Sequence, residues 1–157
     1  MPGQPLRVAV IGTSFASAVQ IPGFQLLPDV EVVAVASANP DRAALTAEKF
    51  GIPGAYGDWR KLLDEVDCDL VSIVTPPYLH REMVLETVAR GRHVFCEKPF
   101  ALNLAEGLDM VEAVEKSGLV HAVDHEFRYR PARSRMKELI VAGHLGEPRV
   151  IRWAWLL

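Results

Sequence analysis

Glu97, Lys98 and Pro99 place a carboxylate, an amine and a proline side by side, directly after the apolar residues 94–96. An apolar run that ends in charge is typical of a buried parallel strand that emerges at a cleft, where open α/β sheets bind their ligands. The proline holds Lys98 extended, or across a cis bond, and Glu97 can orient a hydroxyl or the lysine amine. We interpret Lys98 as a proton-transfer group. The alternative is a surface Glu-Lys pair at a strand end.

Gly12 follows the first apolar stretch, residues 6–11, and a helical stretch comes after it. The spacing is similar to the dinucleotide fingerprint G-x-G-x-x-G, but Ser14 and Ser17 hold the second and third glycine places. Gly12 can still make the tight turn, and small serines let a phosphate approach the free N–H groups of a helix N-terminus. A plain strand-to-helix turn is the alternative.

The end of the second apolar stretch, residues 30–36, carries no acidic residue that could bind an adenosine ribose. Ser37 stands there and leaves room for a 2′-phosphate, which Arg42 could reach from the following helix. The pattern favours NADP over NAD without excluding NAD. Arg42 could equally be a solvated helix charge.

Further polar and rigid residues follow later strands. Thr75, Pro76 and Pro77 predict a rigid turn that forms a backbone wall beside the cleft, because proline cannot continue a central strand. For His80 a structural hydrogen-bonding role at a helix start is favoured over catalysis. Arg128 either contacts a cofactor or substrate or braces the next helix. The histidines lack metal-ligand spacing, so no metal site is predicted.

Short apolar strands alternate with amphipathic helices, which predicts an α/β fold with a doubly wound parallel sheet. Strands are expected over residues 6–11, 30–36, 70–74, 93–96 and 120–123. Helices are expected over 40–50, 58–65, 80–90, 101–117 and from 132 to Gly143. The helix over 101–117 is marked by Ala101, Leu104, Leu108 and Val111.

The composition limits the partners. The formal net charge of −3 argues against nucleic acid and membrane surfaces. Two cysteines are too few for a secreted disulfide scaffold, and the N-terminus shows no signal-peptide core, so a cytoplasmic location is expected.

The tail, residues 147–157, alternates like a strand that stops before its partner appears. We therefore expect a domain over residues 1–146 followed by the first strand of a truncated second domain. A terminal strand that completes this sheet is the alternative.

Several of these motifs together resemble the glucose–fructose oxidoreductase / inositol dehydrogenase / MocA (Gfo/Idh/MocA) family, in the same order and over nearly the whole chain. They are Gly-Thr-x-Phe from Gly12, Thr-Pro with His80, the run that ends in Glu97-Lys98-Pro99, and Phe127-Arg128-Tyr129 with Pro131. The resemblance implies an NAD(P)-binding Rossmann domain that precedes a substrate domain, and a homo-oligomer for the full-length protein. The missing glycines and the missing ribose acid depart from the family pattern.

The resemblance also assigns roles. Lys98 would act at the reacting carbon, where hydride moves between nicotinamide and an alcohol carbon of a sugar, cyclitol or related polyol. The implied cofactor-binding residues are Gly12, Thr13, Ser14, Phe15, Ala16, Ser37, Arg42, Thr75, Pro76, Pro77, His80, Glu97, Lys98 and Arg128. The fragment alone is expected to bind cofactor and turn over little. The alternative is a non-catalytic dinucleotide-binding or regulatory module, or a different nucleotide in the same fold.

Overall fold

The computed structural model describes residues 4–152 and 154, which divide into two compact units, one ending at Asp124 and the other beginning at His125. In the first unit the strands are β1 (Leu6–Ile11), β2 (Val30–Ala36), β3 (Gly54–Tyr56), β4 (Leu70–Ile73), β5 (His93–Glu97) and β6 (His121–Asp124). Its helices are the π-helix η1 (Ala16–Gln20), α1 (Ile21–Gln25), α2 (Pro40–Phe50), α3 (Trp59–Glu65), the 3-10 helix η2 (Pro77–Leu79), α4 (His80–Ala89) and α5 (Leu104–Ser117).

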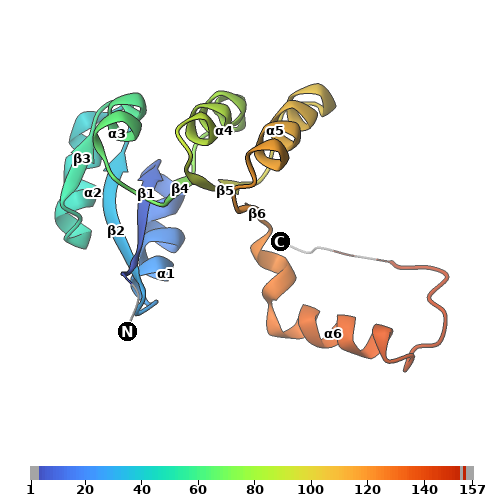
Figure 1. Ribbon diagram of the computed structural model, residues 1–157. Coiled ribbons are helices and arrows are strands. Elements are labelled where there is room, and N and C mark those ends of the chain that lie inside the picture. Colours follow the sequence, from blue (N-terminus) through green and yellow to red (C-terminus); the bar gives the residue numbers. More distant parts are fainter. Residues whose placement is uncertain (1–3, 153, 155–157) are drawn as a thin grey trace. The chain divides into compact units, whose positions relative to one another are not determined.

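The described strands form one all-parallel sheet with the order β3-β2-β1-β4-β5-β6. The chain runs outward from β1 to β3, then crosses to β4 on the other side of β1 (Figure 1). This is the strand order of a dinucleotide-binding sheet, and its switch point lies between β1 and β4. The predicted doubly wound parallel sheet is therefore confirmed.

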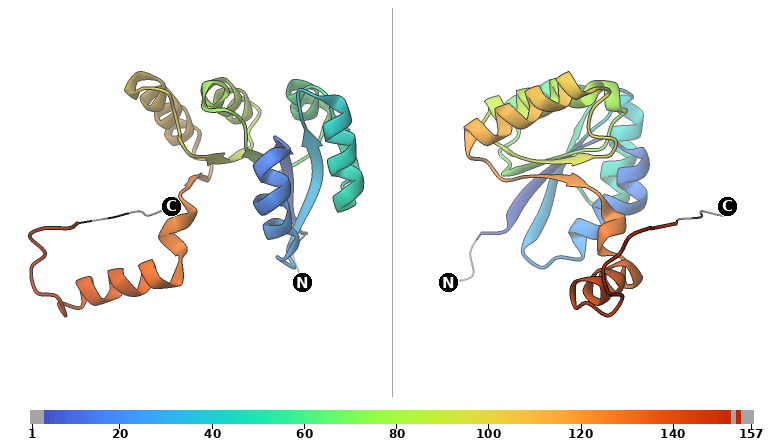
Figure 2. Two further views of the ribbon diagram at one scale, coloured as in Figure 1. Left: turned by 180° about the vertical axis from the view of Figure 1, so that it is seen from behind. Right: turned by 90° about the vertical axis from the view of Figure 1, so that its right-hand side faces the viewer.

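Helices cover both faces of this sheet, and each face has its own core. Alternate residues of β1 explain the division: Ala9 and Ile11 face α3, α4 and α5, whereas Val8 and Val10 face η1, α1 and α2. All four residues are at most 2% exposed. The views of Figure 2 show α4 and α5 on one side of the sheet and α1 on the other. A strand buried on both faces reads as the continuous apolar run from which it was predicted.

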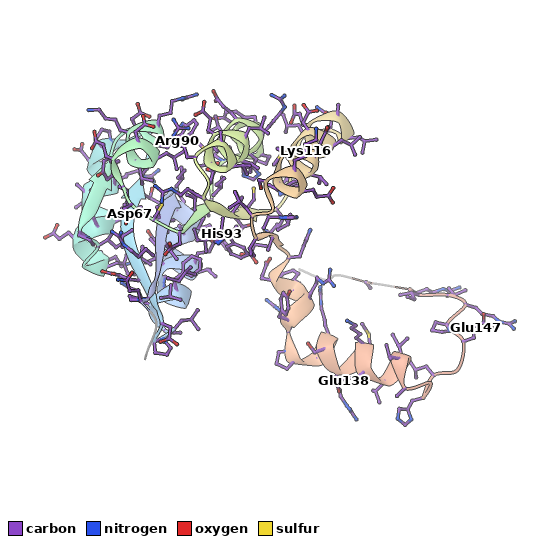
Figure 3. The ribbon with its side chains drawn as sticks, in the orientation of Figure 1. Asp67, Arg90, His93, Lys116, Glu138 and Glu147 are labelled. Atoms are coloured by element: carbon purple, nitrogen blue, oxygen red, sulfur yellow. The ribbon has the colours of Figure 1, made fainter. Side chains whose placement is uncertain are left out.

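Ion pairs and backbone contacts gather at the amino ends of the central strands. Asp67, just before β4, pairs with Arg7 of β1 and with Arg92 before β5, at 3.4 Å for the second pair. Asp69 accepts the backbone N–H of Arg7 at 2.8 Å, and its own carbonyl accepts the N–H of His93 at 2.8 Å. Asp67 and His93 are labelled in Figure 3. Because Asp67 is largely exposed, its ion pairs contribute little stability individually.

Helix α5 begins where predicted to within a turn, but its buried face differs from the expected markers. Asn103 caps the helix by accepting the N–H of Glu106 at 3.0 Å. Met110 and Val114 are its buried residues, whereas Leu104 and Leu108 are 77% and 57% exposed. At 3.6 residues per turn the two pairs lie roughly 120° apart around the helix axis. The apolar pattern predicted the helix, but the apolar residues that marked it are not the ones that pack against the sheet.

The second unit contains the 3-10 helix η3 (Glu126–Tyr129) and α6 (Pro131–Val141). The guanidinium groups of Arg130 and Arg133 lie over the Phe127 ring, 4.4 and 4.8 Å from its centre. The described part of the tail, residues 147–152 and 154, is not in a strand; the rest of the predicted terminal strand lies outside the described residues. The predicted domain boundary at residue 146 stays a prediction. Within the described residues, no helix is long and apolar enough to span a membrane.

Candidate functional site

The turn after β1 depends on Gly12, whose φ of +120° lies in a region that L-residues with side chains rarely adopt. A Cβ built on this residue would lie 2.1 Å from the carbonyl oxygen of Val74. The turn therefore brings the backbone after β1 against the end of β4, at the switch point of the sheet. Residues 13–15 then lead into η1, a π-helical turn of a kind that is frequent at functional sites.

A cavity of about 780 Å³ opens at this switch point, within the usual size range of ligand pockets. It gathers the carboxyl-end residues of β1, β2 and β4 together with the starts of α2 and α3. Eight of the predicted cofactor-binding residues line it: Gly12, Thr13, Ser14, Phe15, Ser37, Arg42, Thr75 and Pro76. Strands from different parts of the chain thus bring most of the predicted site together.

Ser37 and Arg42 lie together at the β2 corner of this cavity. Ser37 Oγ accepts the N–H of Asn39 at 3.3 Å, and Asn39 Oδ1 accepts the N–H of Arg42 at 3.1 Å, which caps α2. The Arg42 side chain is exposed and lines the cavity, and no ion pair is found for it among the described residues. This corner offers a hydroxyl and a cation, with no carboxylate at the end of β2.

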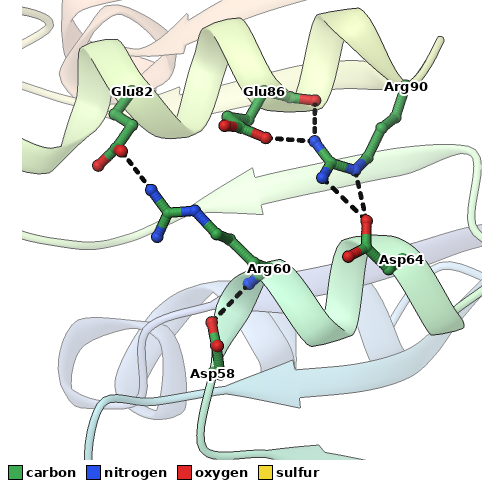
Figure 4. Close-up of polar contacts among 6 residues, drawn as sticks. All are labelled: Asp58, Arg60, Asp64, Glu82, Glu86 and Arg90. Carbon is green, nitrogen blue, oxygen red and sulfur yellow. Dashed lines mark hydrogen bonds and ion pairs between the residues drawn. The ribbon is translucent and has the colours of Figure 1, made fainter.

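Asp58 and Trp59 also line the cavity, although the sequence interpretation placed them at a helix start and gave them no ligand role. Asp58 caps α3 by accepting the N–H of Arg60 at 2.9 Å. Arg60 in turn pairs with Glu82 of α4, so the cavity wall at α3 is tied to the neighbouring helix (Figure 4). Asp58 and Trp59 reach the cavity because β3 pairs with β2, which brings the start of α3 to this place.

A second link joins α3 to α4 at their far ends. Arg90 pairs with Asp64 of α3 at 2.8 Å and with Glu86 one turn earlier on its own helix (Figure 4). The hydrogen bonds to the two carboxylates raise the pKa of the Arg90 guanidinium.

Other residues that line the cavity but were not predicted from the sequence include Tyr78, Leu79 and Met83. They come from the η2–α4 segment after Pro76, where their apolar character gave no ligand signal.

Lys98 lies beside the cavity rather than in its wall. Its side chain is exposed, and its Nζ is 5.8 Å from the centre of the Phe15 ring, which does line the cavity. The Lys98–Pro99 peptide bond is cis, one of the two arrangements that the sequence predicted. The lysine amine therefore approaches the same loop that makes the turn after β1.

Glu97 is buried, with 5% of its surface exposed, and it does not line the cavity. Its Oε2 accepts the backbone N–H of Lys98 at 2.9 Å, and its Oε1 accepts the side-chain N–H of Gln20 at 3.1 Å. The expected contact with the lysine amine or a ligand hydroxyl is thus replaced by contacts within the protein. The reason is its position as the last residue of β5, where the side chain turns into the core.

Burial is the main cause that raises the pKa of Glu97, and the hydrogen bond and negative charge of Asp124 raise it further. The amide donors of Lys98 and Gln20 act in the opposite direction and lower it. Next to it, burial and the charge of Glu97 raise the pKa of the Cys96 thiol to about 12. Cys96 is therefore a neutral, buried strand residue.

His80 is completely buried, and both of its ring nitrogens face backbone carbonyls. Nε2 lies 2.8 Å from the oxygen of Thr75 and Nδ1 lies 3.2 Å from the oxygen of Phe100. The ring joins the turn after β4 to the loop after Pro99. This geometry is that of the structural hydrogen-bonding role favoured from the sequence, and His80 has no face on the cavity.

The other predicted residues are not among those that line the cavity. Ala16 is fully buried in the core beside β1, and Pro77 begins η2 without reaching the lining. Arg128 belongs to the second unit, where it lines a separate open hollow of about 560 Å³ with Tyr129 and residues of α6. Among the described residues no group of three or more His, Cys, Asp or Glu side chains could hold a metal ion.

Comparison with known proteins gives this arrangement its context. Residues 6–125 match the model of the Gfo/Idh/MocA oxidoreductase family, NAD-binding Rossmann fold. The chain is 36% identical over 122 residues to a levoglucosan dehydrogenase of Pseudarthrobacter phenanthrenivorans, which covers 78% of this chain and 31% of that protein. It is 34% identical to a D-glucoside 3-dehydrogenase of Escherichia coli, with 94% of this chain and 42% of that protein covered.

Solved structures agree with these relatives. An oxidoreductase from Agrobacterium radiobacter, solved with NAD+, L-tartaric acid and magnesium, matches 92% of this chain and 42% of its own with a TM-score of 0.88 and 29% identity. A 3-ketoreductase from Actinomadura kijaniata, solved with TDP-benzene and NADP, matches 92% of this chain and 46% of its own with a TM-score of 0.84 and 28% identity. The chain thus spans less than half the length of these proteins. With the family model matched over the whole sheet and the cavity at its switch point, the chain belongs to the Gfo/Idh/MocA oxidoreductase family and comprises its NAD-binding Rossmann domain.

Proposed function

We propose that the cavity at the β1–β4 switch point binds the dinucleotide of an oxidoreductase that acts on an alcohol carbon of a sugar, cyclitol or related polyol. The single observation that carries this proposal is the gathering of the Gly12 turn, the β2 end and the Thr75–Pro76 turn around one cavity of about 780 Å³. The nicotinamide cofactor supplies hydride chemistry when it is bound. The names of the relatives, which include levoglucosan and glucoside dehydrogenases, favour the substrate class.

The residues present fit such a cofactor. Backbone N–H groups of the loop at Thr13 and Ser14 stand at the start of the helical segment after β1, where anions bind favourably. At the β2 corner, Ser37 leaves space and Arg42 supplies positive charge, which favours a 2′-phosphate and therefore NADP over NAD. A carboxylate at this position would repel the 2′-phosphate, whereas the Ser37 side chain carries no charge.

Lys98 is the residue that we propose as catalytic. Its exposed amine lies next to Phe15 at the cavity rim, so in its neutral form it could accept the proton of a substrate hydroxyl, and the ammonium so formed could release that proton to solvent. The Glu97 carboxylate holds the backbone of Lys98 by accepting its N–H. The complete substrate site requires a second domain, which we propose to begin after residue 146. We also propose that the full-length protein is a homo-oligomer. The chain by itself is then a cofactor-binding domain with little turnover.

A non-catalytic dinucleotide-binding module is the second candidate, because Ser14 and Ser17 replace two fingerprint glycines. The two functions differ in the need for Lys98. In the full-length protein, Lys98→Met should lower alcohol oxidation about 10²–10⁴-fold while leaving nucleotide affinity within about twofold, as for the loss of a positioned acid or base. Turnover that survives this substitution would contradict the role of Lys98.

The cofactor proposal is tested by fluorescence titration of the chain with NADPH and NADH. We expect NADPH to bind more tightly, and Arg42→Ala to weaken NADPH about tenfold with little change for NADH. Arg81→Ala is the matched control, because Arg81 is an exposed arginine paired with Asp109 away from the cavity. A clear NADH preference that Arg42→Ala leaves unchanged would refute the NADP assignment. Failure of both nucleotides to bind would refute the site.

A further inference from the structure

Gln20, the last residue of η1, lies at the centre of a buried polar network beneath Lys98. Its side-chain nitrogen donates to Glu97 Oε1 and to Asp124 Oδ2, both at 3.1 Å. Its side-chain oxygen accepts the hydroxyl of Ser72, a fully buried residue of β4. One amide group therefore joins the carboxyl halves of β4, β5 and β6, and every polar atom of the Gln20 side chain has a partner.

The network ends at the backbone of Lys98. Glu97 has one oxygen bound by Gln20 and the other bound by the Lys98 N–H, so Gln20 determines how the carboxylate meets that N–H. Gln20 is 5% exposed and does not line the cavity, so it has no part in holding a ligand directly. We propose that Gln20 is a positioning residue for Lys98, acting through Glu97 with Ser72 and Asp124 as its supports. This inference rests on the proposed catalytic role of Lys98.

The network also holds two carboxyl groups side by side, because Glu97 and Asp124 both accept the same side-chain nitrogen of Gln20, each at 3.1 Å. Burial and the neighbouring Asp124 raise the pKa of Glu97. The titratable groups that face Glu97 are Asp124 of β6 and the Cys96 thiol of β5, while Gln20 and Ser72 are neutral. When both carboxyl groups are ionised they repel each other, so the support of Lys98 weakens as pH rises. Positioning through this network therefore depends on pH, which simple packing would not.

The test is native-state hydrogen exchange of the assigned Lys98 backbone amide in the 157-residue chain. Gln20→Met keeps the length of the side chain and removes its polar atoms. We expect it to lower the protection factor of the Lys98 amide about tenfold, the usual effect of losing a hydrogen bond to a charged group. Ser72→Ala should have a smaller effect in the same direction. Gln25→Met is the matched control. Gln25 lies on α1, and its side-chain nitrogen donates to the backbone oxygen of Phe50 at 2.8 Å, so it has no part in the network.

Two outcomes would overturn the inference. One is a Lys98 protection factor that stays within twofold of the wild type in Gln20→Met. The other is an equal fall in the protection factor of the Val10 amide in the central strand, which would mean that the whole fold is destabilised. Because this measurement needs neither cofactor nor turnover, it is independent of the Lys98→Met experiment that tests the proposed function.

The pH profile gives a second, fold-preserving test. In the wild type the protection factor of Lys98 should fall as pH rises through the raised pKa of Glu97. In Asp124→Asn the negative charge next to Glu97 is removed, so protection should persist at higher pH and its pH dependence should flatten. An unchanged pH profile in Asp124→Asn would overturn the role of this neighbouring carboxylate, and with it the coupling of Lys98 to the network.

Discussion

Gly12 lies so close to Val74 that a Cβ on the glycine would be 2.1 Å from the valine carbonyl oxygen. Gly12→Ala must therefore separate the ends of β1 and β4, and it also imposes an unfavourable φ. We expect a loss of about 2–4 kcal/mol in the free energy of unfolding, measured by urea denaturation, together with loss of nucleotide binding.

Gly51→Ala is the control for this prediction, since Gly51 also has a positive φ but has no atom within 4 Å of the added Cβ. It should lose about 1 kcal/mol. Equal losses would contradict the close-contact explanation.

Ser37→Asp should reverse the cofactor preference. An aspartate at the end of β2 can bind a ribose 2′-hydroxyl and repels a 2′-phosphate, so NADH affinity should rise and NADPH affinity should fall about tenfold. Parallel fluorescence titrations measure both. Ala44→Asp changes the net charge equally on an exposed position of α2 outside the cavity lining, and it should leave the preference unchanged. A variant that binds both nucleotides as the wild type does would show that Ser37 does not lie at the ribose.

The raised pKa of Glu97 predicts a specific pH dependence of stability. The folded chain keeps the Glu97 proton above the group's ordinary value of 4.5, where the unfolded chain has released it. This contribution to stability is therefore fully present below that value and is lost as pH rises through the folded-state pKa. Relative to the wild type, Glu97→Gln should become progressively more stable as pH rises from about 5 to 8, measured by urea unfolding at each pH. A constant difference across this range would contradict the prediction.

His80→Leu separates a structural from a catalytic role for the buried imidazole. The substitution leaves the carbonyls of Thr75 and Phe100 without the ring, so the free energy of unfolding should fall by about 1–3 kcal/mol. Thr87→Val on the same helix is the control, because the buried Thr87 hydroxyl has no hydrogen-bond partner among the described residues and its loss should be close to neutral. Unchanged stability with lost nucleotide binding would place His80 at the site instead.

The sheet could be predicted from sequence because its central strands are buried on both faces. Such strands are continuous apolar runs with glycine, proline or charge at their ends, as in β1, β2 and β4, and the carboxyl ends of parallel strands meet at one edge. This reasoning predicts that Gly12, Ser37 and Thr75 lie together, and all three line the cavity. What a periodic pattern does not contain is the direction of each apolar stripe, and Leu104 and Leu108 of α5 illustrate that limit.

The buried network could not be predicted in the same way. Gln20 and Asp124 are 104 positions apart, and neither belongs to a motif with a chemical signature. Their contact depends on the π-helical η1, which turns Gln20 towards the ends of β5 and β6. Asp58 and Trp59 were missed for a related reason: only the pairing of β3 with β2 brings the start of α3 to the cavity.

The contacts of Asp67 and Asp69 with Arg7, Arg92 and His93 lie at the amino ends of the strands, opposite the cavity. These contacts support the strand register at the amino end of the sheet and involve none of the residues that line the cavity. Exposed side chains of the cavity loops, such as that of Arg42, can therefore be exchanged without touching them. This division of labour lets one scaffold diversify its ligands over evolutionary time, and it identifies the loops after β1, β2 and β4 as the place to redesign cofactor choice.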